Sequence, residues 1–418
     1  MRGFSETCLS VAKQRLLAKG SGEIRVAVLC RHDLSSLEPG DKIHTYDKIM
    51  ALAMQTPVIL FTPRAHAPRG MESQMEVLQV FPDGVLFWLA LILALVMHRN
   101  NYDCVYTRDP VLMFYATPMK AFGKTLILEM NGIPSLETQI RRRTHRVRAP
   151  SLTPLMCSAI RLAEAFAIRC ADLILPVTKR MRATIIRDYG ANPGKVVVVP
   201  NSVDTKIFRP LEDKRTEMRQ TLGIGRETVV LYLGTFSARW RMSEQLFWVA
   251  SDIQRKRSDI MFLVVGSGPL LEEIKAVVGE FAMSDRMRFV GAVDHSLVPS
   301  YINASDIYAY DVAGVENELV QKQGLCPTKV LEAMACGRPV IALKEPELEA
   351  LLRESGGGFS ASSLRDMAPL MEKFADSADL AKSMGANARR YVESNHDLTR
   401  LTRLTVELIS EVVSSRRS

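Results

Sequence analysis

The sequence predicts an α/β protein with two doubly wound domains, and three observations support this prediction. The chain has 418 residues and 47% hydrophobic content, which is long for one domain and enough for two ordinary cores. Short apolar runs alternate with segments of helical periodicity along most of the chain. Glycine-rich or polar turns follow most of these runs, as expected where strands lead into helices. We therefore expect two open, mostly parallel sheets.

The first domain is expected at residues 1–194. The apolar run Val85–Met97 is too short to span a bilayer comfortably, so it predicts a buried helix between strands. A second helix is expected around Ile160–Ile168. The strands predicted for this domain are Ile24–Leu29, Val58–Phe61, Cys104–Tyr106, Leu126–Leu128 and Leu173–Val177.

The second domain is expected at residues 195–395, followed by a helix in 396–418. The apolar stripe of Leu398–Val413 must pack on another surface. Ligands of doubly wound sheets bind beyond the carboxyl ends of the strands, so a cleft between two Rossmann-like domains is the expected site. The strands predicted here are Val196–Val199, Val229–Tyr232, Met261–Val265, Arg288–Val290, Ile307–Tyr310 and Val340–Leu343.

The formal net charge of +8 favours anionic partners, namely nucleotide diphosphates, acidic lipid surfaces or nucleic acid. No zinc-finger, RNP-like or helix-turn-helix pattern accompanies the charge, so nucleic acid is the weaker alternative and is not expected as a partner. The seven cysteines form no CxxC pair, which fits a reducing compartment. The first twenty residues lack the continuous apolar core of a signal peptide. A cytoplasmic location is therefore expected.

The segment Cys326–Ala342, CPTKVLEAMACGRPVIA, is the most informative stretch of the chain. Pro327 suits the first turn of a helix, and Gly337 suits a left-handed stop before a buried strand. Lys329 and Glu332 are three residues apart and share a helix face. Such a pair could bind a polyol phosphate, or it could be a surface ion pair.

This segment resembles the pattern S-P-x-K-x-x-E-x-M-A-x-G-x-P-V of retaining GT-B glycosyltransferases, specifically glycosyltransferase family four, also called glycosyl transferases group 1. Other segments resemble family patterns in the same order, among them VVVVPNSVDTKIFRP, FLVVGSGP and LEMNGIP. The resemblance implies a GT-B fold whose last helix crosses back to the first domain. It also implies transfer of a sugar from a nucleotide-diphosphate sugar to an acceptor hydroxyl, with retention of configuration and without a cofactor or metal.

The resemblance implies a donor site in the second domain. Arg241 and Lys329 would stabilise the charge that develops on the leaving diphosphate, and Glu332 would accept hydrogen bonds from the ribose hydroxyls. Many relatives carry a further Glu eight residues before Glu332, where this chain has Gly324. The other expected donor-binding residues are Gly234, Arg239, Gly266, Gly268, Gly291, Val293, Pro327 and Thr328.

The first domain is expected to hold the acceptor side. Many relatives carry His where Asn131 stands, and Asn cannot titrate, so no general base is carried over to this position. The glycine loop and first helix supply candidates that could face the cleft, and two later strands end in polar side chains. The expected acceptor-side residues are Gly40, Lys42, His44, Arg108, Glu129 and Asn131.

The run Thr138–Ala163 contains six arginines and no acid. It could be a solvated loop, or it could contact an anionic acceptor or a membrane surface. In the second case the protein would lie peripherally at the inner face of the membrane. The arginines expected to make this contact are Arg141, Arg142, Arg143, Arg146 and Arg148.

The predicted partners are thus a nucleotide sugar and a glycan or lipid-linked acceptor. Two other activities stay open. A GT-B nucleotide-sugar epimerase would use a similar donor site with a different set of carboxylates. A catalytically inactive nucleotide-sugar-binding protein would explain the Gly at position 324.

Overall fold

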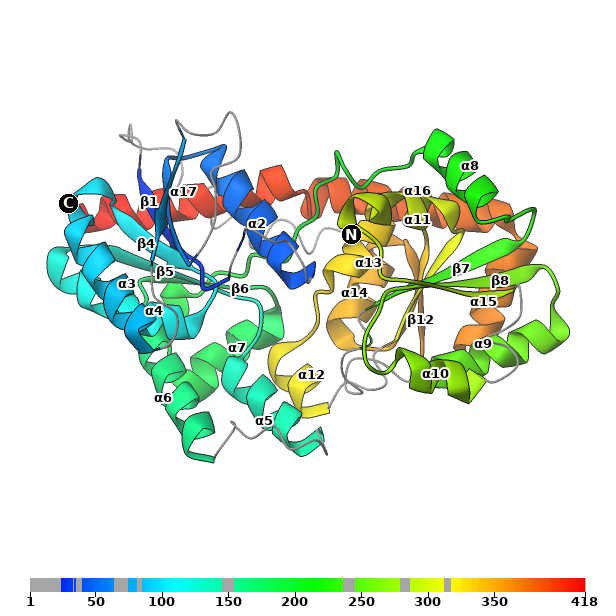
Figure 1. The fold of residues 1–418 in the computed structure, drawn as a ribbon, viewed down its shortest axis with the longest axis horizontal. Helices are drawn as coiled ribbons and strands as arrows, with labels where there is room; N and C mark the ends of the chain where they lie inside the picture. Colours follow the sequence, from blue (N-terminus) through cyan, green and yellow to red (C-terminus); the bar gives the residue numbers. More distant parts are fainter. Residues whose placement is uncertain are drawn as a thin grey trace. The chain divides into compact units, whose positions relative to one another are not determined.

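The computed structural model describes residues 24–32, 34, 40–63, 74–80, 85–144, 154–234, 236, 245–278, 286–311 and 317–417. The chain forms two compact units (Figure 1). One contains the chain up to Pro200 together with Leu398 onward, and the other contains Asn201–Asp397. In the described part of each unit, six parallel strands form one sheet. This confirms the predicted α/β class with two doubly wound sheets; the cleft between them stays a prediction.

The sheet of the first unit has the strand order β3-β2-β1-β4-β5-β6. Helices α2 and α17 cover one face, and α3 and α4 cover the other (Figure 1). Because both faces are covered, most strands are apolar throughout rather than alternating. The strands are β1 (Val26–Leu29), β2 (Val58–Thr62), β3 (Met75–Gln79), β4 (Cys104–Thr107), β5 (Thr125–Met130) and β6 (Leu173–Pro176). The helices are α2 (Gly40–Ala53), α3 (Val85–Met97), α4 (Pro110–Ala116), α5 (Pro134–Thr144), α6 (Pro154–Cys170), α7 (Lys179–Tyr189) and α17 (Leu398–Arg417).

The sheet of the second unit has the order β12-β11-β10-β7-β8-β9. Alternate residues of its strands enter two separate cores: Val230 and Tyr232 pack with α9 and α15, whereas Val229 and Leu231 pack with α11, α13 and α16. The strands are β7 (Thr228–Leu233), β8 (Ile260–Val265), β9 (Met287–Gly291), β10 (Ile307–Tyr310), β11 (Val340–Leu343) and β12 (Gly358–Ala361). The helices are α8 (Glu212–Thr221), α9 (Gln245–Lys256), α10 (Leu271–Val278), α11 (Val298–Ala304), α12 (Asn317–Gln323), α13 (Thr328–Ala335), α14 (Pro346–Ser355), α15 (Met367–Asp376) and α16 (Ala378–Asn395).

Two sequence predictions about the elements are wrong. Val196–Val199 is not a strand of the second sheet: Val196 bridges Ile174, and the extended segment runs beside β6 of the first sheet. Helix α3 is not buried, because Leu89, Leu93 and Met97 are exposed. The strands β3 and β12 were not predicted, since β3 has only one fully buried residue and β12 begins with a glycine.

The final helix α17 is part of the first unit. Leu401, Leu408 and Ile409 are buried in the core that also contains β1, β4 and α2. Its apolar stripe therefore packs on the sheet of the unit that the chain left at Pro200. No helix in the part of the chain that the structure describes has the length and apolar character needed to cross a membrane.

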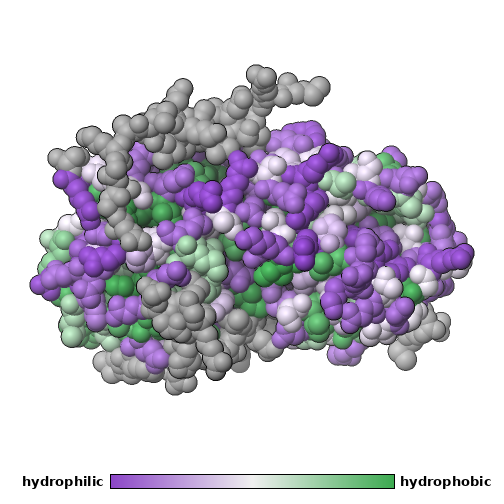
Figure 2. All heavy atoms as spheres, turned by 90° about the horizontal axis from the view of Figure 1, so that it is seen from above, coloured by the Kyte–Doolittle hydropathy of each residue, from purple (hydrophilic) through white to green (hydrophobic). Residues whose placement is uncertain are grey.

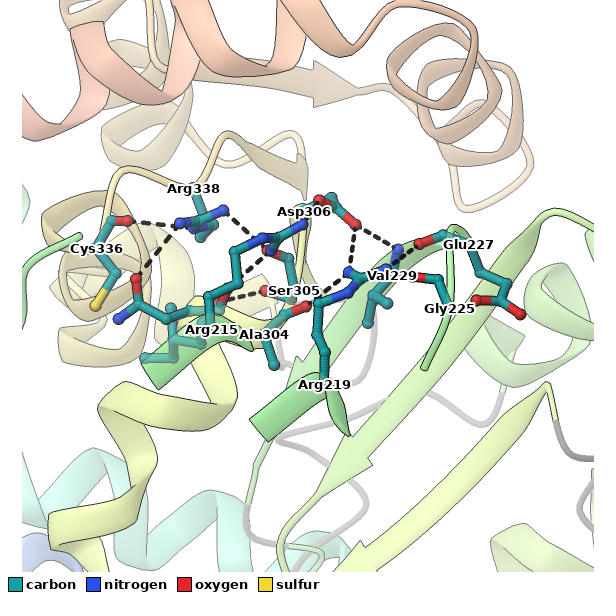
Figure 3. A network of polar contacts seen from close by, with 12 residues as sticks. Arg215, Arg219, Gly225, Glu227, Val229, Ala304, Ser305, Asp306, Cys336 and Arg338 are labelled. Carbon is teal, nitrogen blue, oxygen red and sulfur yellow. Dashed lines mark hydrogen bonds and ion pairs between the residues drawn. The ribbon is translucent and has the colours of Figure 1, made fainter. Parts of the chain in front are cut away.

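A charged network fixes the amino-terminal edge of the second sheet (Figure 3). Arg215 and Arg219 both bind the Asp306 carboxylate, at 2.6 and 3.3 Å, and Asp306 also accepts the Val229 N–H. The same arginines and Arg338 donate to carbonyls at the end of α11, where cations complement the helix dipole. Asp306 thus has a structural role at the edge opposite to the one where such sheets bind ligands.

Candidate functional site

At the carboxyl edge of the second sheet, the loops after three adjacent strands touch through their backbones. The Gly234 N–H donates to the Val265 carbonyl at 3.0 Å, and the Gly266 N–H donates to the Gly291 carbonyl at 2.7 Å. A Cβ at Gly266 would lie only 1.8 Å from the Gly234 carbonyl oxygen, and its φ is +134°. The structure therefore brings together Gly234, Gly266 and Gly291, and at Gly266 no side chain fits.

Phe236 anchors the first of these loops, and the sequence reasoning missed it. Its side chain is fully buried, its N–H donates to the Ser267 carbonyl, and its carbonyl accepts the Leu270 N–H, both at 3.0 Å. A Cβ at Gly268 would lie 2.4 Å from the Phe236 carbonyl. The sequence did contain a signal for this anchor, namely an aromatic residue two positions after the glycine that ends a buried strand.

Helix α13 begins at Thr328, with Pro327 as its extended N-cap residue rather than in its first turn. Val330, Leu331 and Met334 are fully buried, as their spacing predicted, and Gly337 adopts the expected left-handed conformation with φ +71°. Glu332 is only 3% exposed, whereas Lys329 is half-buried. The helix therefore does not present these two residues as a solvated surface ion pair.

The loop that leads into α13 is held by the segment that enters the second unit. Asn201 Nδ2 donates to the Cys326 carbonyl at 2.7 Å. The Asn201 carbonyl lies 2.9 Å from Nδ1 of the buried His396, and the Val203 N–H donates to the His396 carbonyl. Asn201 thus links the chain near His396 to the loop before α13.

The structure also shows what fills the space at Gly324. This residue has φ +63°, and a Cβ built on it would lie 2.7 Å from the carboxyl carbon of Glu347 and 2.8 Å from both carboxylate oxygens. Glu347 belongs to the first turn of α14, which follows the carboxyl end of β11. A carboxylate from another helix therefore lies over the position where the family resemblance leads one to expect an acidic side chain.

The carboxyl edge of the first sheet is built differently, from ionised side chains. Arg108, directly after β4, places Nε 2.9 Å from Oε1 of Glu129 near the end of β5. Lys48 of α2 places its ammonium 3.9 Å from the other carboxylate oxygen, and the Tyr106 hydroxyl donates to that same oxygen. Lys48 also donates to Thr405 of α17 at 3.3 Å. We call Lys48, Tyr106, Arg108 and Glu129 the charged cluster.

Burial and charge act in opposite directions on the charged cluster. Burial alone would raise the pKa of the Glu129 carboxyl, but Lys48, Arg108 and hydrogen bonds from Tyr106 and Asn131 together lower it below its ordinary value. Burial lowers the pKa of the Lys48 ammonium, although the Glu129 carboxylate opposes this change. The carboxylate is thus held ionised between two cations.

The remaining acceptor-side residues lie around this cluster. Gly40 is the first residue of α2, and Lys42 and His44 are half-buried in its first two turns. The His44 carbonyl accepts a hydrogen bond from Arg108 at 3.2 Å. Asn131 directly follows β5. Sequence reasoning missed Lys48 because its position within a helix gives no local sign of its distant partners.

Several predicted residues cannot be placed in this way. Arg239, Arg241, Arg146 and Arg148 lie outside the described residues. For the run Arg141–Arg143, the structure describes the backbone as part of α5 but not the side chains. Val293 is half-buried just beyond β9. Within the described ranges, no three His, Cys, Asp or Glu side chains come close enough to hold a metal ion.

Comparison with known families gave two matches. Residues 40–207 match the model described as Glycosyltransferase Family 4, and residues 227–377 match the model described as Glycosyl transferases group 1. Alpha-D-kanosaminyltransferase of Streptomyces kanamyceticus is 25% identical over 285 residues, which cover 67% of this chain and 71% of that protein.

A second relative is the GDP-mannose-dependent alpha-(1-6)-phosphatidylinositol monomannoside mannosyltransferase of Mycolicibacterium smegmatis. It is 27% identical over 176 residues, covering 41% of this chain and 44% of that protein, so the match spans less than half of its length. Among solved structures, Anabaena HepE in complex with UDP superposes with a TM-score of 0.69 and 16% identity, covering 93% of this chain and all of that one. At this identity the likeness concerns the fold.

Proposed function

The chain belongs to glycosyltransferase family four and has the GT-B fold, and on this premise we propose that it transfers a sugar from a nucleotide-diphosphate sugar to an acceptor hydroxyl with retention of configuration. The observation that carries the proposal is the carboxyl edge of the second sheet, where three glycine turns meet in the unit that also holds α13 with its buried Glu332. Backbone packed this closely, in the same unit as a buried carboxylate, suits the tight seating of a nucleotide.

We assign the donor chemistry to protein groups. Glu332 accepts hydrogen bonds from the two ribose hydroxyls, because an ionised carboxylate is only an acceptor. Lys329 and Arg241 stabilise the negative charge that grows on the diphosphate as the sugar leaves. Arg239, Val293, Pro327, Thr328 and the glycines 234, 266, 268 and 291 line the remainder of the donor site. No metal takes part in this proposal.

We assign the acceptor to the carboxyl edge of the first sheet. Asn131 offers a neutral amide to a hydroxyl, and the charged cluster behind it keeps Glu129 ionised. Gly40, Lys42 and His44 complete this side. A lipid-linked acceptor is supported by the name of the mycobacterial relative, which acts on a phosphatidylinositol mannoside. The lipid acceptor of that relative and the arginines of 141–148 here both support a cytoplasmic location at the inner face of a membrane.

The test is acceptor-dependent release of nucleotide. Thermal shift with UDP- and GDP-sugars first identifies the donor, since a bound donor stabilises the fold. Nucleotide release that requires an added acceptor supports a transferase. Glu332→Gln should weaken donor affinity by about tenfold or more, whereas Glu349→Gln, a half-buried α14 residue paired with Lys344, should not. Unchanged donor affinity of Glu332→Gln would contradict the assigned site.

Binding without turnover is the second candidate, and Gly324 favours it because the usual upstream carboxylate is missing. Glu347, which lies over Gly324, is our candidate to supply the missing contact to the sugar. If it does, Glu347→Gln should lower the rate of transfer while nucleotide affinity stays the same. Donor binding with no nucleotide release in the wild type would instead support a binding protein, and release without acceptor would support an epimerase.

A further inference from the structure

Helix α3 has an apolar stripe on its outer side as well as on its inner side. Its thirteen residues contain no polar side chain. Phe87, Leu91 and Leu95 recur every fourth residue and are buried. Leu89, Leu93 and Met97 recur with the same spacing and are 57%, 62% and 78% exposed. A helix that is apolar all round is normally enclosed on all sides, so this outer stripe requires an explanation.

Helix α6 also has a stripe of exposed apolar side chains. Leu155, Leu162 and Phe166 are 80%, 71% and 48% exposed. Together with the exposed Ala159 they follow the 4-3-4 spacing of one helix face. Scattered exposed leucines are normal on any protein, but an exposed apolar stripe on each of two helices that pack against α4 is not.

Aromatic contacts join the two stripes through α4, which packs against both helices (Figure 1). Trp88 of α3 stacks on Tyr115 of α4 with ring centroids 4.3 Å apart. Phe114, next to Tyr115, meets Phe166 of α6 edge-on at 5.6 Å. We group the two stripes and the aromatic side chains that link α3, α4 and α6, and call them the apolar face. In the view of Figure 2, hydrophilic side chains predominate among the coloured atoms.

The exposed charged side chains of α3, α4 and α6 that the structure describes have one sign. Helices α3 and α4 contain no acidic residue, and the single acid of α6, Glu164, is fully buried and bound by Ser135 and Tyr189. Arg161 and Arg169 are exposed on α6. Near the end of α3, Arg99 lies over the half-exposed Phe122 ring at 5.5 Å. An apolar surface bordered by arginines matches the acyl and anionic headgroup layers of a bilayer.

We propose that the apolar face docks on the surface of an anionic lipid bilayer. A second copy of the chain fits less well, because a two-fold contact would enclose Arg161 and Arg169 of both copies, and α3, α4 and α6 expose no acid to pair with them. Helix α3 is about 20 Å long and the hydrocarbon core is about 30 Å thick, so the helix lies in the interface rather than across it. This inference deepens the membrane part of the proposed function and does not depend on the transfer reaction.

Sedimentation with vesicles of phosphatidylcholine, with and without phosphatidylglycerol, tests the proposal. The wild type should bind the anionic vesicles, and Leu89→Gln/Leu93→Gln should lower its partition constant by about tenfold or more. Leu155→Gln/Leu162→Gln is the second variant, so that a folding failure in either one leaves the test intact. The matched control is Ile207→Gln/Leu297→Gln, which changes exposed apolar residues of the second unit and should bind like the wild type.

Two outcomes would overturn the proposal. One is equal vesicle binding by the wild type and both apolar-face variants. The other is a wild-type dimer in lipid-free sedimentation that these variants convert to a monomer, which would assign the face to a second copy. Donor binding, measured by thermal shift without lipid, should be unchanged in every variant. Loss of vesicle binding in the variants with intact donor binding therefore supports the role of the apolar face. Absence of donor binding in the wild type would instead contradict the proposed function.

Discussion

The candidate site residues at the carboxyl edges of the two sheets are of two different kinds. In the second unit the edge is made of backbone: the loops at Gly234 and Gly266 approach so closely that a Cβ at Gly266 would overlap the Gly234 carbonyl. In the first unit the edge is made of ionised side chains, with Glu129 held between Lys48 and Arg108. The edge in the second unit depends on the absence of side-chain atoms, and the edge in the first unit depends on the balance of charges. The second unit should therefore be sensitive to an added methyl group, and the first unit to the removal of one charge.

The largest effect should come from Gly266→Ala. The added Cβ would lie 1.8 Å from the Gly234 carbonyl oxygen, and backbone atoms cannot yield as a flexible side chain can. We expect a loss of more than about 5 kcal/mol in the free energy of unfolding, measured by urea denaturation, or failure to fold.

Gly291→Ala is the matched control for this substitution. Gly291 also has a positive φ, +85°, but nothing lies within 4 Å of the position that a Cβ would take there. Only the left-handed strain of about 1–2 kcal/mol should appear. Equal losses in the two variants would show that strain, rather than close backbone approach, controls the donor-side edge.

The next effect should come from Glu129→Gln, which keeps the size of the side chain and removes its charge. The buried Lys48 and the half-buried Arg108 would lose their counterion, and we expect a loss of about 3–5 kcal/mol in the free energy of unfolding. Because the folded-state pKa of Glu129 lies below its ordinary 4.5, its contribution is present above that pH and is lost as the pH falls through the folded-state value. The variant should therefore show a weaker acid dependence of stability than the wild type.

The double variant Lys48→Met/Glu129→Gln provides the control. Removing the buried ammonium as well should restore part of the lost stability, because the two charges are coupled. Additive losses would mean that Lys48 and Glu129 do not interact, which would contradict the charged cluster as described.

The contrast between the edges also explains what the sequence could predict. The core stripe of α13 follows from helical spacing. The turn at Gly234 follows from its place after a buried strand, whereas Gly266, Gly268 and Gly291 were named through the family resemblance. Lys48 was missed because its partner Thr405 lies 357 residues further along the chain. The exposure of Leu93 was missed because an apolar helix shows no polar side that would mark its outer face. Val196–Val199 was assigned to the wrong sheet because an apolar run carries no information about which strand it joins.

Asn201 offers a way to examine the donor side without touching its glycines. Asn201→Ala removes the hydrogen bond to the Cys326 carbonyl, which fixes the loop before α13. We expect a loss of about 1–2 kcal/mol in the free energy of unfolding and a weaker donor affinity, measured by calorimetric titration of the donor. Asn395→Ala, which removes a bond to Tyr391 within α16, is the control and should leave donor affinity unchanged. Unchanged affinity in both variants would mean that the entry segment does not position α13.

The smallest effect should be the pH dependence of stability that comes from His396 in the second unit. Burial lowers the pKa of its imidazole below the ordinary 6.5, although the bond to the Asn201 carbonyl opposes this change. Below pH 6.5 the unfolded chain therefore takes up a proton that the folded chain does not, and stability falls as the pH falls. We expect the wild type to lose about 1 kcal/mol more than His396→Asn between pH 7 and pH 5, measured by urea denaturation at each pH. The pKa of Glu129 lies below 4.5, so this carboxyl titrates on the acid side of the range. Parallel curves for the two proteins would therefore show that His396 is not held neutral in the folded chain.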